Sequence, residues 1–130
     1  MRNCLLAILI LYTSVSGAQS IAKLIVPVGH KAAVKNCYFS PNDQYLVSAD
    51  EEHGLCIWDG NDGRQLYKLS DTSGHFNKVA FNPGSTLLAA ISDSTLYLLD
   101  FLKLKILYTV NRVGDFSFSP DGSHLFMIVK

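Results

Sequence analysis

The most constraining feature of this 130-residue sequence is a short unit that occurs three times. Residues 37–42, 79–84 and 116–122 each place a phenylalanine two positions before a proline, and polar turn residues follow. The three prolines lie at positions 41, 83 and 120, so their spacings are 42 and 37 residues. A period of about 40 residues is typical of repeat proteins whose units bury their faces against one another. We therefore expect a row of similar units.

Each unit contains short strand-like segments separated by turn residues. In the first unit, apolar, aromatic and β-branched residues alternate with clusters of Pro, Asn, Asp and Gly, which is typical of antiparallel strands. The predicted strands are residues 34–39, 45–49, 55–58 and 65–69. Upstream, residues 22–28 (AKLIVPV) predict an outer or edge strand because Pro27 lacks an N–H group. At the other end, residues 125–129 (LFMIV) predict a strand of the third unit.

Residues 29–69 resemble one complete repeat of the WD-repeat β-propeller family, because they begin with Gly29-His30 and carry Trp58-Asp59 on the third predicted strand. The resemblance implies an all-β fold, an incomplete β-propeller of about two and a half four-stranded antiparallel blades. Within residues 19–130, the expected blades span about residues 30–70, about 72–110 and, for the start of the third, about 111–130.

Ring closure removes the exposed sheet edges of a propeller. Two and a half blades cannot close a ring, and residues 125–129 would then be a bare apolar edge strand. We therefore expect an N-terminal piece of a longer exported propeller protein, or self-association that covers the edges.

Family repeats also carry a side-chain network that joins a His, a Ser or Thr, an Asp and a Trp. A buried indole N–H needs an acceptor, and a hydroxyl linked to an imidazole and a carboxylate supplies one. The resemblance places the four positions of the first repeat at His30, Ser48, Glu52 and Trp58. The matching positions of the second repeat are Thr72, Ala89, Asp93 and Leu99, and Thr109 stands at the His position of the third. We expect a structural role for this network, largely lost after the first repeat.

Residues 1–18 are interpreted separately as a signal peptide. Arg2 is followed by the apolar run 4–12, and Ser16-Gly17-Ala18 supplies small residues for cleavage after Ala18. The apolar run is too short for a membrane anchor. We expect a secreted or periplasmic protein that starts at Gln19; the alternative interpretation is a buried N-terminal strand or helix.

Two cysteines remain after such cleavage, Cys37 and Cys56. An exported pair suggests a disulfide, but these residues are predicted on the first and third strands of one blade. Two strand spacings of about 4.8 Å exceed the separation of about 7 Å that a disulfide allows. The sequence therefore predicts two free thiols.

No motif indicates catalysis, a cofactor or a metal. The histidines at 30, 53, 75 and 124 lack zinc-site spacing, and the cluster Asp50-Glu51-Glu52 is typical of a solvated turn. His30 with Ser48 is interpreted as part of the repeat network, because no nucleophile elbow is present. We predict no enzymatic activity and no cofactor.

The expected function is an exported scaffold for a protein partner of unknown identity. Two alternatives remain open: the recognition module of a longer secreted enzyme such as a caspase-like peptidase, and a truncated fragment without function. Lys plus Arg equals Asp plus Glu, at 11 each, so the charge predicts neither nucleic-acid binding nor a membrane partner. The resemblance implies binding through five loops, at residues 29–33, 50–54, 71–74, 92–94 and 111–114. Near them, only Arg112 and Phe76 are candidate anchors.

Overall fold

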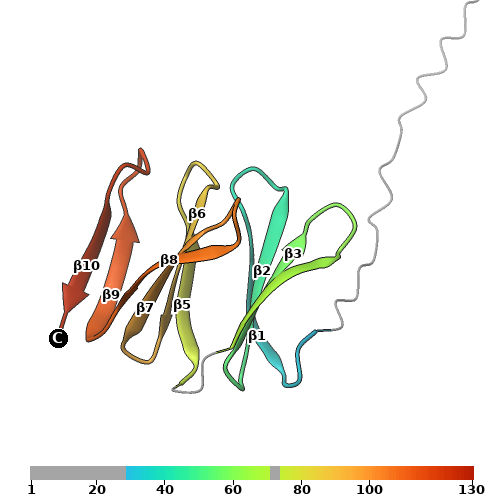
Figure 1. Cartoon of the computed structure of the whole chain (residues 1–130), viewed down its shortest axis with the longest axis horizontal. Coiled ribbons are helices and arrows are strands. Elements are labelled where there is room, and N and C mark those ends of the chain that lie inside the picture. The colour runs from blue at the N-terminus through green and yellow to red at the C-terminus, as the bar shows by residue number, and fades with distance from the viewer. Residues whose placement is uncertain (1–28, 71–73) are drawn as a thin grey trace, which may run out of the picture.

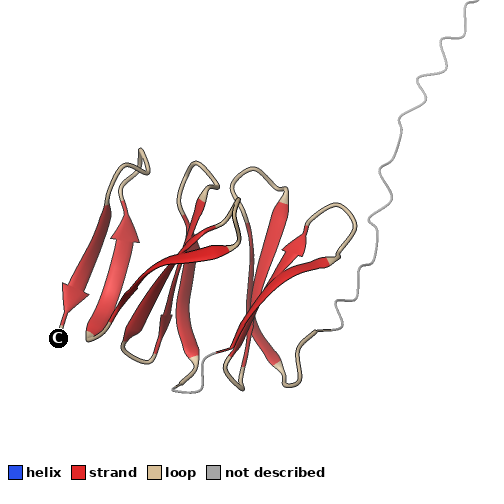
Figure 2. Cartoon of the chain, in the orientation of Figure 1, coloured by secondary structure: helices blue, strands red, loops and turns tan. Residues whose placement is uncertain are grey.

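The computed structural model describes residues 29–70 and 74–130. Every regular secondary-structure element in these residues is a β-strand. Ten strands form three antiparallel sheets that stand side by side (Figures 1 and 2). The first sheet contains β1 Val34–Phe39, β2 Tyr45–Asp50, β3 Gly54–Asp59 and β4 Gln65–Ser70. The second contains β5 Phe76–Phe81, β6 Leu87–Ser92, β7 Thr95–Asp100 and β8 Lys105–Val110. The third contains β9 Val113–Phe118 and β10 Leu125–Val129.

Within each sheet the strands pair in sequence order, so every connection is a hairpin. We call the three sheets blade 1, blade 2 and blade 3. This arrangement confirms the predicted all-β fold of two four-stranded blades and a two-stranded start of a third. The edge strand and the signal peptide, predicted at residues 22–28 and 1–18, lie outside the described residues. Among the described residues, no helix is long and apolar enough to cross a lipid bilayer.

The hairpin turns that carry the repeated proline share one construction. Asp43, Ser85 and Gly122 occupy the same turn position and all have positive φ, at 58°, 52° and 73°. In the first turn the Ser40 hydroxyl accepts the Tyr45 N–H at 3.0 Å, and in the second the Asn82 side chain accepts two backbone N–H groups. Side chains that bond to nearby backbone favour turns over strands. The repeated unit recognised in the sequence is therefore a repeated turn.

The hydrophobic core lies between the blades. Blade 1 contributes Val47, Ala49, Leu55 and Ile57 to a cluster with residues of blade 2. The opposite side of blade 2 packs against blade 3 in a second cluster that includes Val113 and Phe116. Strand β6 supplies both clusters, with Leu88 and Ala90 on one side and Ala89 and Ile91 on the other. Burial on both faces explains why its sequence, LLAAIS, lacks polar alternation.

Strand β10 is paired with β9 alone among the described strands. Its outer side chains are largely exposed: Phe126 and Ile128 at 66% each and Val129 at 60%. This is the apolar edge that the sequence predicts. At the other side of the row, β2 lies between β1 and β3, so Cys37 and Cys56 are two strands apart, as predicted. Cys37 is exposed and Cys56 is buried.

Candidate functional site

A chain of hydrogen bonds crosses blade 1 from β3 to the segment before β1. The indole Nε1–H of Trp58 donates to the Ser48 hydroxyl at 2.7 Å, and Ser48 Oγ lies 2.6 Å from His30 Nε2. His30 Nδ1 lies 2.7 Å from a carboxylate oxygen of Asp50. These directions are mutually consistent when Ser48 donates to Nε2 and Nδ1–H donates to Asp50. We call these four residues the blade 1 network.

The acid of this network is Asp50, whereas the sequence analysis placed the acid at Glu52. The second oxygen of Asp50 accepts the backbone N–H groups of Glu52 at 3.0 Å and Gly54 at 2.7 Å. Glu52 thus contacts the network only through its backbone, and it is exposed. Ser48 and Asp50 stand two residues apart on β2, and alternate residues of a strand share a face. That spacing was the signal in the sequence for Asp50.

Asp50 is held as a carboxylate. Burial by itself raises the pKa of Asp50, but the hydrogen bond from His30 and those from the Gly54 and Glu52 backbone outweigh it. The net result is a pKa below the ordinary value of 3.8. An ionised carboxylate accepts hydrogen bonds only, so it fixes the proton of His30 on Nδ1 and leaves Nε2 for Ser48.

The Ser48–His30–Asp50 order is the order of a hydrolase triad, but the surroundings do not suit catalysis. Ser48 is only 4% exposed, and its oxygen already accepts the Trp58 N–H. A nucleophilic serine must reach a substrate carbonyl beside an oxyanion hole. The geometry instead satisfies the buried indole donor, which is a structural task. Nearby, burial raises the pKa of the Cys56 thiol to about 11, so this cysteine is also unsuited to act as a nucleophile.

Blade 2 lacks the network, although the strand register shows which residues replace it. Leu99 faces Leu88 as Trp58 faces Leu46, so Leu99 stands in the tryptophan position as predicted. Ala90 faces Val79 as Ser48 faces Cys37, so the serine position is Ala90 and the prediction of Ala89 was one residue off.

The acid position of blade 2 also differs from the prediction. Ser92 pairs with Phe76 as Asp50 pairs with Val34, so Ser92 holds this position. Asp93, predicted there, is a turn residue with a φ of 50°. The Ser92 hydroxyl is buried and has no hydrogen-bond partner within the described structure. Thr72, predicted at the His position, lies outside the described residues.

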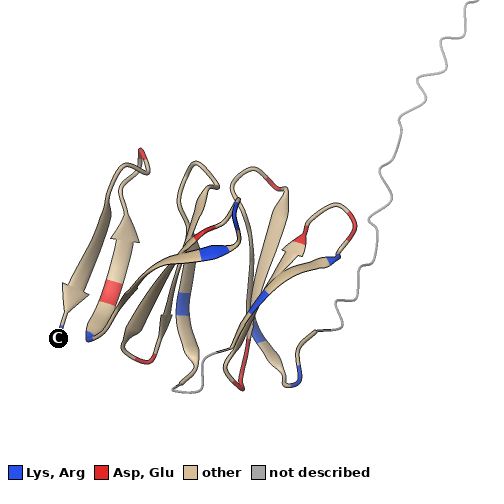
Figure 3. Cartoon of the chain, in the orientation of Figure 1, with Lys and Arg blue, Asp and Glu red and all other residues tan. Residues whose placement is uncertain are grey.

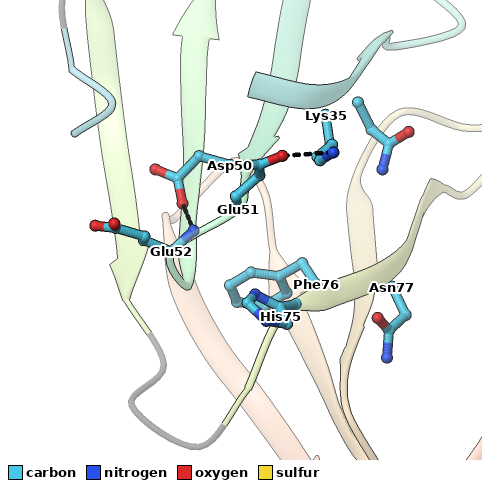
Figure 4. Close-up of a pocket in the computed structure, with 8 residues that line it drawn as sticks. Lys35, Asp50, Glu51, Glu52, His75, Phe76 and Asn77 are labelled. Carbon is cyan, nitrogen blue, oxygen red and sulfur yellow. Dashed lines mark hydrogen bonds and ion pairs between the residues drawn. The ribbon is translucent and has the colours of Figure 1, made fainter. Parts of the chain in front are cut away.

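A pocket lies where the β2–β3 turn of blade 1 approaches the beginning of β5 in blade 2. We call it the interblade pocket; its volume is about 670 Å³. Its lining residues are Lys35, Asn36, Asp50, Glu51, Glu52, His75, Phe76 and Asn77 (Figure 4). The predicted binding loop 50–54 therefore borders this pocket, whereas residues 71–73 of the predicted loop 71–74 lie outside the described residues.

The charged groups of the interblade pocket mostly have contacts within the chain. Lys35 forms an ion pair with Glu51, and Asp50 is bonded to His30. The Glu52 carboxylate points away from His75 and Phe76 (Figure 4). Phe76, considered as an exposed anchor in the sequence analysis, is only 4% exposed and belongs to the core. The pocket thus offers polar side chains around a partly apolar wall.

Outside the pocket, residues of both charges are mixed along the described chain. Figure 3 shows acidic and basic residues interspersed over turns and strands of the described chain. Within the described residues, no three His, Cys, Asp or Glu side chains are placed to hold a metal ion.

Comparison with known proteins gives the family. The sequence model described as "WD domain, G-beta repeat" matches residues 21–59 and 63–100, which is more than half of the chain. The chain belongs to the WD-repeat family. These repeats indicate a scaffold for protein interactions.

Relatives and solved structures agree with this membership. The chain is 35% identical over 63 residues to the U5 small nuclear ribonucleoprotein 40 kDa protein of Pongo abelii, covering 48% of this chain and 18% of the relative. It is 30% identical over 106 residues to eukaryotic translation initiation factor 3 subunit I of Nematostella vectensis, covering 78% and 33%. The crystal structure of the RRP9 WD40 repeats superposes with a TM-score of 0.67 at 20% identity, covering 77% of this chain and 33% of that one. The chain thus spans about a third or less of these proteins.

Proposed function

We propose that this chain is a non-catalytic scaffold that binds a protein partner at the interblade pocket. The observation that carries the proposal is the position of the pocket: it lies between two blades, beside the β2–β3 turn, and is walled by residues of both β1 and β5.

The charge pattern favours a protein over a nucleic acid as the partner. Three of the eight lining residues are acidic and one is basic, so a phosphate backbone would be repelled there. Elsewhere in the described chain, the basic residues are interspersed with acidic ones (Figure 3). Two observations support a scaffold without catalysis: Ser48 is buried, and its hydroxyl is bonded to Trp58.

A pair of matched substitutions tests this function. Asn77→Arg places a bulky cation on the pocket wall, and Asn61→Arg places the same side chain on the β3–β4 turn, at the opposite end of blade 1. Both variants and the unchanged chain are used for affinity capture from an extract of the native source, followed by mass spectrometry. We expect Asn77→Arg to lose proteins that Asn61→Arg retains. Equal capture by both variants would contradict binding at this pocket.

We also propose that the scaffold is exported, with cleavage of a signal peptide after Ala18. The charged start, the apolar run and the small residues before Gln19 support this, and the family match begins only at residue 21, just beyond the proposed cleavage site. N-terminal sequencing of the protein from its native source tests the proposal. A start at Gln19 is expected, and a start at Met1 or Arg2 would contradict export through this segment.

A further inference from the structure

Two histidines from different blades stack on each other. His53 lies in the β2–β3 turn, and His75 lies directly before β5. Their ring centroids are 5.0 Å apart and their planes differ by only 14°. His53 Nδ1 also lies 2.6 Å from the carbonyl oxygen of Gly74. Because a carbonyl only accepts, Nδ1 must carry a proton and donate it. The turn of blade 1 is thus joined to the entry of blade 2 by a stack and a hydrogen bond.

We propose that this pair is an acid-sensitive contact between blades 1 and 2, which loosens when both imidazoles are protonated. Imidazole is the side chain that ordinarily gains its charge between pH 5 and pH 8. Two cationic rings at this distance repel each other, whereas two neutral rings do not. The hydrogen bond from His53 Nδ1 survives protonation because that nitrogen is a donor in both states. The sensitivity therefore resides in the ring stack.

The charged groups around the pair shape the response. Glu52 precedes His53 in the turn, and the Asp93 carboxylate of the β6–β7 turn lies against Gly74. These two acids are the negative charges that lie beside the pair. Asp50 is engaged by His30, and Glu51 by Lys35 of β1, so neither is free to neutralise a second cation.

Loosening of this contact is local. The apolar cluster between the blades, which includes Leu55 and Leu88, contains no titratable side chain among its buried members, so its packing does not itself respond to protonation. The segment at His75 is held by the stack, by the hydrogen bond from His53 to Gly74 and by a 3.2 Å bond from the Asp93 N–H to the His75 carbonyl, and it leads into the buried Phe76. His75 and Phe76 also wall the interblade pocket, so acid changes one side of that pocket.

Nuclear magnetic resonance of the full chain between pH 8 and pH 5 tests the proposal. The imidazole resonances of His53 and His75 report protonation, and exchange of the Asp93 amide, which bonds the His75 carbonyl within blade 2, reports whether the segment at His75 loosens. After correction for the intrinsic dependence of exchange on pH, we expect Asp93 protection to fall about fivefold or more as the second proton is taken up. Unchanged protection down to pH 5, or titration of the two rings as independent groups, would overturn the proposal.

Matched variants separate the pair from general effects of acid. His75→Gln keeps a planar, polar side chain but removes the charge, so the Asp93 protection should no longer depend on pH. His124→Gln is the control, because His124 stacks on Phe126 in blade 3, away from this contact. A His75→Gln variant that retains the pH dependence of the native chain would also overturn the proposal. His53→Asn supplies a second test, because asparagine tolerates the positive φ of 72° at this position.

Discussion

Ser48 is the centre of the blade 1 network, and its replacement by alanine should be strongly destabilising. The hydroxyl serves two partners: it accepts the Trp58 N–H at 2.7 Å and lies 2.6 Å from His30 Nε2. Ser48→Ala leaves the indole N–H without an acceptor, and Trp58 is only 2% exposed. An unsatisfied buried group costs about 1–3 kcal/mol, and the loss of the hydrogen bond to His30 Nε2 adds a part of the same penalty. We expect a loss of about 2–4 kcal/mol in the free energy of unfolding.

A double-mutant cycle isolates the hydrogen bond within that loss. Trp58→Phe removes the indole donor, so Ser48→Ala should cost less in the Trp58→Phe background, by about 1–2 kcal/mol. Urea unfolding followed by far-ultraviolet circular dichroism suits the cycle, because it does not depend on the tryptophan. The reasoning would be refuted if Ser48→Ala cost under about 0.5 kcal/mol or if the two substitutions were additive.

Three further predictions concern individual side chains. The pKa of Asp50 is lower in the folded chain than in the unfolded chain, so the carboxylate stabilises the fold fully above the unfolded pKa near 3.8, and this stabilisation is lost as the pH falls through the folded pKa. In the Asp50→Asn variant, the free energy of unfolding measured in urea should therefore change less between about pH 5 and lower pH than in the native chain. Ser92→Ala should leave stability unchanged or raise it by up to about 1 kcal/mol in thermal unfolding, since the hydroxyl is buried without a described partner; a loss above about 1 kcal/mol would show a hidden partner. At pH 8 a thiol reagent should label Cys37 rapidly and Cys56 only after denaturation, as mass spectrometry would show; equal rates would contradict the burial of Cys56.

The architecture was largely predictable because the repeat is encoded locally. Turn residues such as Ser40 and Asn82 bond to the backbone a few positions away, so the sequence near each proline marks the turn. The flanking strands then follow from alternation and length. The loss of the tryptophan at Leu99 could also be read directly, because it depends only on residue type and position in the repeat.

The errors at the network arose from turn length. The β2–β3 turn of blade 1 spans residues 51–53, whereas the β6–β7 turn of blade 2 spans residues 93–94. Counting back from Trp58 therefore assigned the acid to Glu52, and the same count misplaced the acid of blade 2 at Asp93. Counting along β2 from Ser48 would have reached Asp50, because residues two apart share a strand face.

The contact between His53 and His75 had no local signal at all. The two residues are far apart in sequence, and their stack depends on how one blade is placed against the next. The same holds for the burial of Phe76, which follows from packing against blade 1 and not from the pattern of β5. Contacts between repeats are set by tertiary packing, which a repeat pattern does not specify.

The most direct test of the scaffold account is the reactivity of Ser48. A fluorophosphonate probe attacks serines activated by histidine, and Ser48 has His30 and Asp50 in the order that such activation uses. The native chain is incubated with the probe and its intact mass is measured, with a known serine hydrolase as the positive control. The account predicts an unchanged mass, because Ser48 is buried and bonded to Trp58. A covalent adduct that peptide mapping places on Ser48 would contradict it and would make this network an active site.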